Sequence, residues 1–479
     1  MVENFFTSPL FLLTCLGTFF AYYAFNSPKV QFVILGAVSL FIYWLAAGNL
    51  LFLLLFSATI TGLFSYGSAY ARSDRRKLCM IVGVLLNLSL LVFFKYKHLL
   101  LPRPVFENWF GADPAWQEIY SLALPIGISF YVFHGVSLIV DSYRNPLTLE
   151  ASGRHMATHW FKTLLYISFF PQIVAGPIAK GKFFYPQICL KKIRAVDWKG
   201  AIRALAQGYF LKEVIANNLN QLTSQMVSPS TWASIASSEM LLMVFGYSAQ
   251  IFADFAGYSL IAIGLARLFG YELPINFRQP YFADSFANFW QRWHISLSSW
   301  LKDYLYIPLG GNRKGRLRSY TNLFIVMFLG GLWHGAAWKY AVWGTVHGIA
   351  LAGERAIHHD KFELGFQRPW IIRLLNIALV FVVVSFAWLF FRLDSLQDVV
   401  NYVQHIIDWK SRPSPYHSFA MMMLWVLIGM VFFQHLLGEL KDKNRLGWLV
   451  RFDGAFTGLL FAGCFIAHGK QSAFIYFQF

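Results

Sequence analysis

Long runs without a charged side chain constrain this sequence more than any other feature. Leu374–Phe391 is an 18-residue run between Arg373 and Arg392, and Phe419–Gly438 is a 20-residue run. About 20 apolar residues in a helix cross the ~30 Å hydrocarbon core of a bilayer. The chain has only 13% charged residues, about half the share of an average soluble domain. These features indicate a polytopic membrane protein.

The apolar runs predict thirteen candidate spans: 9–25, 30–47, 49–70, 77–94, 121–140, 161–178, 201–217, 240–265, 320–338, 340–353, 372–391, 419–437 and 454–469. Several are short or interrupted by glycine and proline, which is typical of re-entrant or broken helices packed inside protein. We therefore expect an all-α polytopic membrane protein with about ten to thirteen membrane elements. The chain is expected to form a single domain over residues 1–479, with a core at 40–400 and C-terminal helices and an aromatic tail at 401–479.

The net charge of +17 is concentrated in clusters, among them Arg72, Arg75, Arg76 and Lys77; Lys180, Lys182, Lys191, Lys192, Arg194, Lys199 and Arg203; and Arg313, Lys314, Arg316 and Arg318. Cytoplasmic loops of membrane proteins are enriched in Lys and Arg, and this places the N-terminus outside the cytosol. The same clusters can attract a polyanionic ligand. There is no basic soluble module for nucleic acid, and neither the four cysteines nor the histidine spacing suggests a metal site.

A histidine stands deep inside one candidate span, in "GGLWHGAAW" (330–338). Ionisable side chains at such depth are candidates for function, although a neutral histidine can also hydrogen-bond across two helices as a structural residue. The glycines and alanines around His334 allow another backbone or a thin ligand to approach closely.

A second histidine lies in "FANFWQRWHISLSSWLKDYLYIPLGG" (286–311), where apolar residues recur at three- and four-residue spacing. This pattern predicts one amphipathic or re-entrant helix that directs His294 into the protein. The glycine-rich loop 308–319 joins this segment to the span of His334. Its four cations can hold phosphates, or the loop can simply be a connection.

These motifs resemble the membrane-bound O-acyltransferase family, in particular the bacterial branch that O-acetylates alginate, peptidoglycan and cellulose. The residues that carry the resemblance are "FWQRWHISLSSWLKDYLYIPLGG" followed by "GLWHG", with "LPIGISFYVFHGVSLIVDSYR" (124–144), "FFPQIVAGPI" (169–178), "FADFAGYSLIAIGLARLFGYELPINFRQPY" (252–281) and "FIYFQF" (474–479). The resemblance implies a ring of tilted helices around a central funnel. It also implies catalytic roles for His334 and His294 and a cytosolic acyl donor, acetyl-CoA or an acylated carrier protein. No bound cofactor is implied.

The resemblance further implies a bacterial inner-membrane protein that works with a periplasmic SGNH-like acetyltransferase on a polysaccharide acceptor. We expect His334 to act as a general base. Backbone N–H groups around Gly331–Gly335, or His294, are expected to hold the oxyanion, unless His294 instead orients His334. Donor contacts are expected from Arg313, Lys314, Arg316, Arg318, Trp290 and Trp333. Tyr476 is either an interfacial anchor or an acyl relay to the periplasmic partner.

Two other functions fit parts of the pattern. A related branch transfers D-alanine from a carrier protein to teichoic acid, and it shares the motifs around both histidines. A proton-coupled transporter could also contain buried histidines, but transporters usually show paired broken segments, which this sequence lacks. The sequence therefore favours acetyl transfer and does not identify the polysaccharide.

Overall fold

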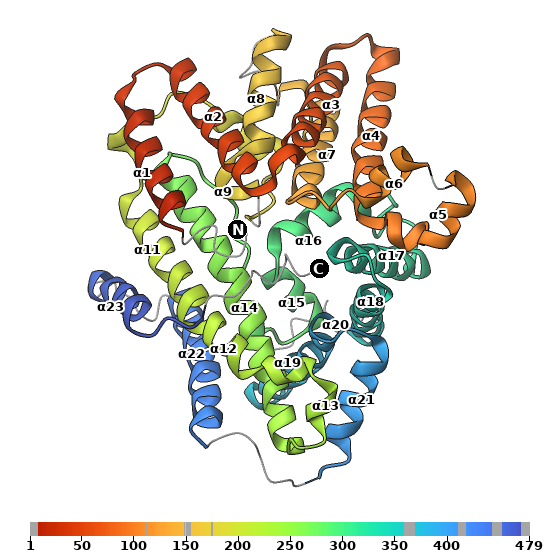
Figure 1. Ribbon diagram of the computed structural model, residues 1–479, viewed down its shortest axis with the longest axis vertical. Helices are drawn as coiled ribbons and strands as arrows, with labels where there is room; N and C mark the ends of the chain where they lie inside the picture. Colours follow the sequence, from red (N-terminus) through yellow and green to blue (C-terminus); the bar gives the residue numbers. More distant parts are fainter. Residues whose placement is uncertain are drawn as a thin grey trace. The chain divides into compact units, whose positions relative to one another are not determined.

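Helices are the regular secondary structure of the part of the chain that the computed structural model describes, with no strand among those residues (Figure 1). The described residues are 8–111, 113–147, 149, 155–173, 176–358, 369–410, 418–442 and 453–470. Each of the thirteen predicted spans corresponds to one or more helices. The all-α fold class predicted from the sequence is therefore confirmed.

The chain divides by its internal contacts into two compact units. Unit 1 comprises Met1–Leu205 and Ile261–Pro274, and unit 2 comprises Ala206–Leu260 and Ile275–Phe479. Two of the three boundaries fall inside continuous helices, α11 (Trp198–Tyr209) and α14 (Ser237–Leu268), and the third falls in the non-helical segment after α14. The single domain predicted over residues 1–479 stays a prediction.

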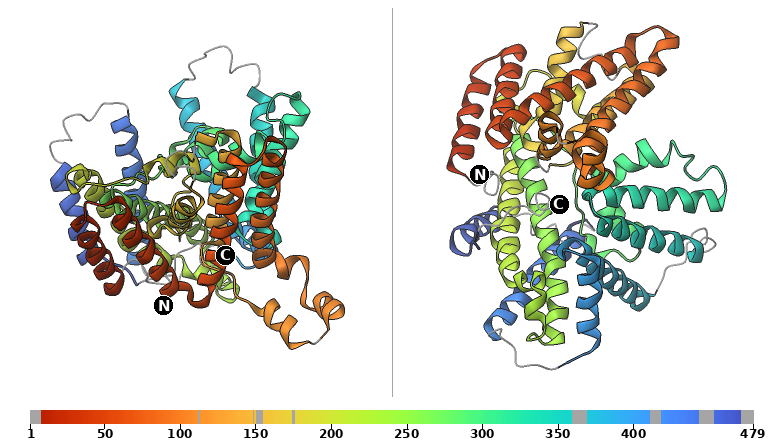
Figure 2. Two further views of the ribbon diagram at one scale, coloured as in Figure 1. Left: turned by 90° about the horizontal axis from the view of Figure 1, so that it is seen from above. Right: turned by 45° about the vertical axis from the view of Figure 1, so that its right-hand side comes forward.

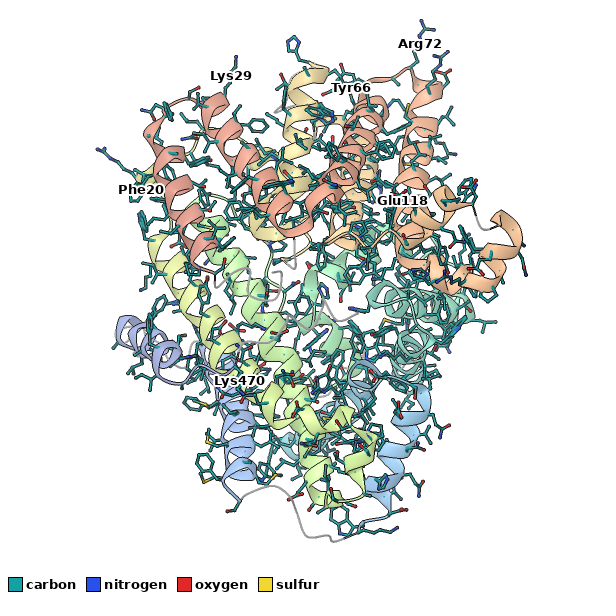
Figure 3. The ribbon with its side chains drawn as sticks, viewed as in Figure 1. Phe20, Lys29, Tyr66, Arg72, Glu118 and Lys470 are labelled. Atoms are coloured by element: carbon teal, nitrogen blue, oxygen red, sulfur yellow. The ribbon has the colours of Figure 1, made fainter. Side chains whose placement is uncertain are left out.

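Unit 1 contains the first ten α-helices: α1 (Pro9–Ala24), α2 (Pro28–Ala47), α3 (Leu51–Tyr70), α4 (Ser73–Leu100), α5 (Arg103–Phe110), α6 (Pro114–Ser121), α7 (Ile128–Arg144), α8 (Met156–Ser168), α9 (Phe170–Ile173) and α10 (Gly181–Phe184). Helices α3, α4 and α7 pack together around the buried Asn87, whose Oδ1 lies 3.3 Å from the hydroxyls of Ser57 and Thr61. Figure 3 shows Lys29 and Arg72 at the same end of unit 1. Lys29 lies at the start of α2, and Arg72 lies just before α4.

Unit 2 continues with the π-helix η6 (Phe210–Ala216) and then α12 (Asn217–Leu222), α13 (Pro229–Trp232), α14, α15 (Phe286–Arg292), α16 (Ile295–Leu301), the π-helix η9 (Lys302–Tyr306), α17 (Arg316–His334), α18 (Trp338–His358), α19 (Trp370–Ala387), α20 (Leu389–Arg392), α21 (Leu396–Ile407), α22 (Ser418–Asp442) and α23 (Asp453–Ile466). In this unit α17 and α18 run side by side as a hairpin (Figures 1 and 2).

Five helical segments of the described chain are long and apolar enough to cross a membrane: Pro28–Tyr70, Ser73–Leu100, Ser237–Leu268, Trp370–Arg392 and Ser418–Asp442. Four of them bury less than half of their most apolar window inside the protein, whereas Ser237–Leu268 buries 83% of it. A helix that is apolar on all sides and buried belongs to the protein interior. Helix α14 is therefore an interior helix, and the other four expose apolar faces suited to lipid.

Two predicted segments end differently in the structure. Within the predicted span 161–178, α8 and α9 are helical, whereas residues 176–178 are not. The helix predicted over 286–311 is wrong as one element, because it breaks between α15 and α16 and its last residues form η9 and turns. The pattern of apolar residues continues across this break, so periodicity alone does not reveal it.

Candidate active site

His334 is the last residue of α17, at the turn into α18. The helix stops at Gly335, whose backbone is extended (φ −162°). A Cβ at Gly335 would overlap the ring of Tyr340, so no larger residue fits at the turn. His334 is only 5% exposed. Its ring therefore lies inside unit 2, where the chain turns between the packed helices α17 and α18.

His294 occupies the break between α15 and α16. Its backbone is left-handed (φ 44°, ψ 52°), and its side chain is fully buried. A left-handed conformation costs a residue with a side chain on the order of 1–3 kcal/mol, and such strain concentrates at functional sites. The side chain of His294 is buried, as predicted. The kink at this residue directs it inward, and not its position on one face of a continuous helix.

The structure brings the two histidines together. Their ring centroids are 6.4 Å apart. Trp333 contacts both rings, with centroids 6.0 Å from His294 and 5.0 Å from His334. His334 follows His294 by 40 positions in the sequence. The short distance between their rings therefore depends on how α15, α16 and α17 pack. One small group, such as a reacting hydroxyl or carbonyl, has access to both imidazoles if it binds between them.

Aromatic side chains enclose His334 on its other sides. The ring of Trp343 lies 5.2 Å from it and that of Phe391 lies 5.4 Å from it, both edge to face. Trp290 is one ring further away, 5.7 Å from Trp343. An apolar wall of this kind excludes water, which protects a reactive thioester and strengthens local electrostatic interactions.

The glycines around His334 serve close helix packing. A Cβ on Gly331 would overlap the carbonyl oxygen of Tyr340 and lie 3.1 Å from Cα of Gly344 in α18. A Cβ on Gly344 would in turn overlap the carbonyl oxygen of Met327. The sequence left open whether the small residues admit another backbone or a thin ligand. At Gly331 and Gly344 they admit the backbone of the neighbouring helix.

The expected oxyanion donors at Gly331–Gly335 are wrong. Residues 331–334 belong to α17, whose N–H groups donate to carbonyl oxygens one turn earlier, and the N–H of Gly335 donates to the carbonyl of Leu332 at 3.2 Å. These backbone donors are thus already used within the helix. They are therefore not available to hold a negative oxygen.

The predicted donor-binding cations do not lie with the histidines. Arg313 and Lys314 are exposed in the loop before α17, and Arg316 and Arg318 are exposed in its first turn. Helix α17 has 19 residues, which places its two ends roughly 27 Å apart. A donor bound to both regions must be long, with anionic groups at one end and the reacting carbon at the other.

Sequence reasoning missed three residues that shape this site. Asn276 contacts the ring of His294, with Oδ1 3.3 Å from Nδ1. His347 is buried between Trp290 and Trp343, with ring centroids 5.2 Å and 4.8 Å away. Glu354 accepts hydrogen bonds from the first N–H groups of α15. The sequence signals only His347, which lies 13 residues after His334 on the next apolar helix.

Tyr476 and the tail "FIYFQF" lie outside the described residues, which end at Lys470. Among the described residues no group of three or more His, Cys, Asp or Glu side chains could hold a metal ion.

Comparison with known proteins places the site in a family context. A sequence model of the membrane-bound O-acyltransferase family matches residues 151–396, a range that includes both histidines. A peptidoglycan O-acetyltransferase of Helicobacter pylori is 30% identical over 99% of this chain and 97% of its own length. The probable alginate O-acetylase AlgI of Pseudomonas aeruginosa is 34% identical over 82% of this chain and 72% of its own. A teichoic acid D-alanyltransferase of Bacillus subtilis is 30% identical over 47% of this chain and 58% of its own.

Proposed function

Since the chain belongs to the membrane-bound O-acyltransferase family, we propose that it moves an acetyl group from cytosolic acetyl-CoA across the inner membrane for O-acetylation of an extracytoplasmic polysaccharide. The observation that carries the proposal is the pair of buried imidazoles, His294 and His334, with ring centroids 6.4 Å apart. The five apolar helices and the family together make the chain a multi-pass membrane protein.

In the proposed reaction, His334 as a neutral imidazole takes the proton from an attacking hydroxyl. A bond forms between that oxygen and the acetyl carbon, and the bond from the carbon to the donor sulfur then breaks. The proton passes to the sulfur, so coenzyme A leaves as a thiol and the imidazole is neutral again. General base catalysis of this kind typically contributes about 10²–10⁴-fold.

The dimensions of α17 support a coenzyme A donor. Cations are exposed at the N-terminal end of the helix and His334 stands at its C-terminal end. The phosphates of the donor would meet Arg313, Lys314, Arg316 and Arg318, while its thioester reaches the histidines. Trp333 contacts both histidine rings, which supports its proposed place beside the acetyl group. The ring of Trp290 contacts that of Trp343.

The relatives favour acetate over D-alanine as the transferred group. The two O-acetyltransferases align with much more of this chain than the D-alanyltransferase does. The donor is tested by supplying purified protein in proteoliposomes with either labelled acetyl-CoA or a D-alanyl carrier protein. Transfer from the carrier protein alone would replace the acetyl proposal with the teichoic acid function.

The last step to the polymer is proposed to use a periplasmic SGNH-like acetyltransferase, with Tyr476 as an intermediate acyl carrier. The N-terminus is placed on the periplasmic side in this proposal. Mass spectrometry of the C-terminal peptide after loading with acetyl-CoA tests the relay, with Tyr476→Phe as its control. Unchanged acetylation of the polymer in that variant would remove Tyr476 from the pathway.

The catalytic assignment is tested with His334→Ala and His294→Ala. Transfer by His334→Ala should fall at least about 100-fold, the loss expected for a general base, while the amount of folded protein in the membrane stays the same. His155→Ala is the matched control, because that histidine is exposed and lies just before α8 in unit 1. Wild-type transfer by folded His334→Ala would refute the proposal.

A further inference from the structure

We propose that Asn276 is a positioning residue that holds neutral His294 in the tautomer with hydrogen on Nδ1, so that Nε2 accepts a hydrogen bond during acyl transfer. This inference rests on the proposed function, since it concerns the second histidine of the same site. It assigns a role to a residue that stands 18 positions before His294, in the segment between α14 and α15.

The first observation is that Asn276 replaces the missing cap of α16. His294 stands at the N-cap position, but its side chain makes no capping hydrogen bond. The carbonyl oxygen of Asn276 accepts from the N–H of Ile295 at 3.0 Å. Its side-chain Oδ1 accepts from the N–H of Ser296 at 3.3 Å and from the Ser296 hydroxyl at 2.6 Å. Asn276 thereby satisfies donors at the helix start, and the imidazole takes no part in the cap.

The second observation fixes which way the amide of Asn276 points. A backbone N–H can only donate, so the atom of Asn276 beside Ser296 N must be the oxygen. On the other side, Nδ2 of Asn276 donates to Oγ of Ser259 at 3.0 Å. A flipped amide would direct its hydrogens at the N–H of Ser296, which is repulsive. Asn276 is 1% exposed, so water cannot relieve such a clash.

The tautomer of His294 follows from this orientation. Oδ1 of Asn276 is an acceptor, and it lies 3.3 Å from Nδ1 of His294. Nδ1 must therefore carry the hydrogen. In a neutral imidazole the other nitrogen then holds the lone pair, because only one of the two is protonated. Neutral His294 is thus an acceptor at Nε2, and it cannot serve as the N–H donor that the sequence left open for the oxyanion.

Helix α14 contacts both Asn276 and His294. Ser259, the partner of Asn276, and Phe255, one turn earlier, both belong to α14. The Phe255 ring meets the His294 ring edge to face, with centroids 4.7 Å apart. Because α14 is buried along most of its length, it provides a rigid base. The strained backbone of His294 is therefore held by contacts from an interior helix and from Asn276.

The inference is tested by comparing Asn276→Leu with Asn276→Asp. Leucine removes the acceptor, and we expect kcat to fall about 10- to 100-fold, as for the loss of a partner that orients a metal-binding histidine, with KM unchanged. Aspartate retains an acceptor for Ser296 and for His294 Nδ1, so it should restore at least part of kcat. A purely structural role would lower the yield of folded protein without separating kcat from KM.

Asn87→Leu is the matched control, since Asn87 is also a buried asparagine that binds neighbouring hydroxyls but lies in unit 1. It should lower the unfolding temperature and leave the kcat of the folded fraction unchanged. Folded Asn276→Leu with wild-type kcat would overturn the inference, and so would Asn276→Asp no more active than Asn276→Leu. If His334→Ala is inactive and Asn276→Leu is fully active, only this inference fails and the proposed function stands.

Discussion

The packing of α17 against α18 makes Gly331→Ala a sharp test of how His334 is placed. A Cβ at position 331 would lie closer than 3.0 Å to the carbonyl oxygen of Tyr340, a separation that real Cβ atoms essentially never show. It would also lie 3.1 Å from both the N and the Cα of Gly344. All three atoms belong to the backbone of α18, so no side chain can rotate away. The two helices must separate locally by on the order of 1 Å to relieve the overlap.

The size of the effect follows from two opposing terms. Overpacking a close contact typically costs about 1–3 kcal/mol, and the overlap with backbone puts this site near the upper end. Alanine in place of glycine within a helix raises the free energy of unfolding by about 1 kcal/mol, because alanine has the higher helix propensity. We therefore expect Gly331→Ala to lower the free energy of unfolding by roughly 2 kcal/mol. Activity should suffer more, because a 1 Å misplacement in an active site can cost about 100-fold in rate.

The assay pairs thermal unfolding in detergent with acetyl transfer in proteoliposomes. Gly353→Ala in the same hairpin is the control, since its added Cβ meets nothing within 4 Å and the substitution should be neutral or stabilising by up to about 1 kcal/mol. If Gly331→Ala unfolds at the wild-type temperature and transfers acetyl at the wild-type rate, the close packing does not position His334 and the reasoning is refuted.

Two further predictions concern unit 2. Lys212→Met should destabilise the protein by about 3–5 kcal/mol, because it removes the cation of a buried ion pair, in which the ammonium lies 2.7 Å from the carboxylate of Asp254 and the side chains are 6% and 3% exposed. Adding Asp254→Leu should recover most of that loss in the same unfolding assay, and a double variant as unstable as the single one would contradict this. Glu354→Ala should lower stability by about 1–2 kcal/mol and also reduce transfer, because it removes the acceptor for the N–H groups of Phe286 and Ala287, which begin the helix leading to His294. Glu354→Gln keeps an acceptor and should lose less, so equal losses in both variants would argue against the hydrogen bonds.

The sequence by itself determined the helices and the identity of the two histidines. Each of the thirteen apolar runs contains at least one helix, because a chain in lipid must satisfy its backbone groups within each segment, and this requirement is local. Such features depend on neighbours within one or two turns, which the sequence displays directly.

Only the tertiary structure decided how the two histidines are placed. The apolar periodicity of 286–311 gives no sign of a kink at His294, because a left-handed residue there is held by Asn276 and by α14, both distant in sequence. The role of Gly331 likewise depends on Tyr340 and Gly344 in the neighbouring helix. The energy that maintains a strained backbone or a close helix contact comes from partners across the fold, and no local pattern of residues reports it.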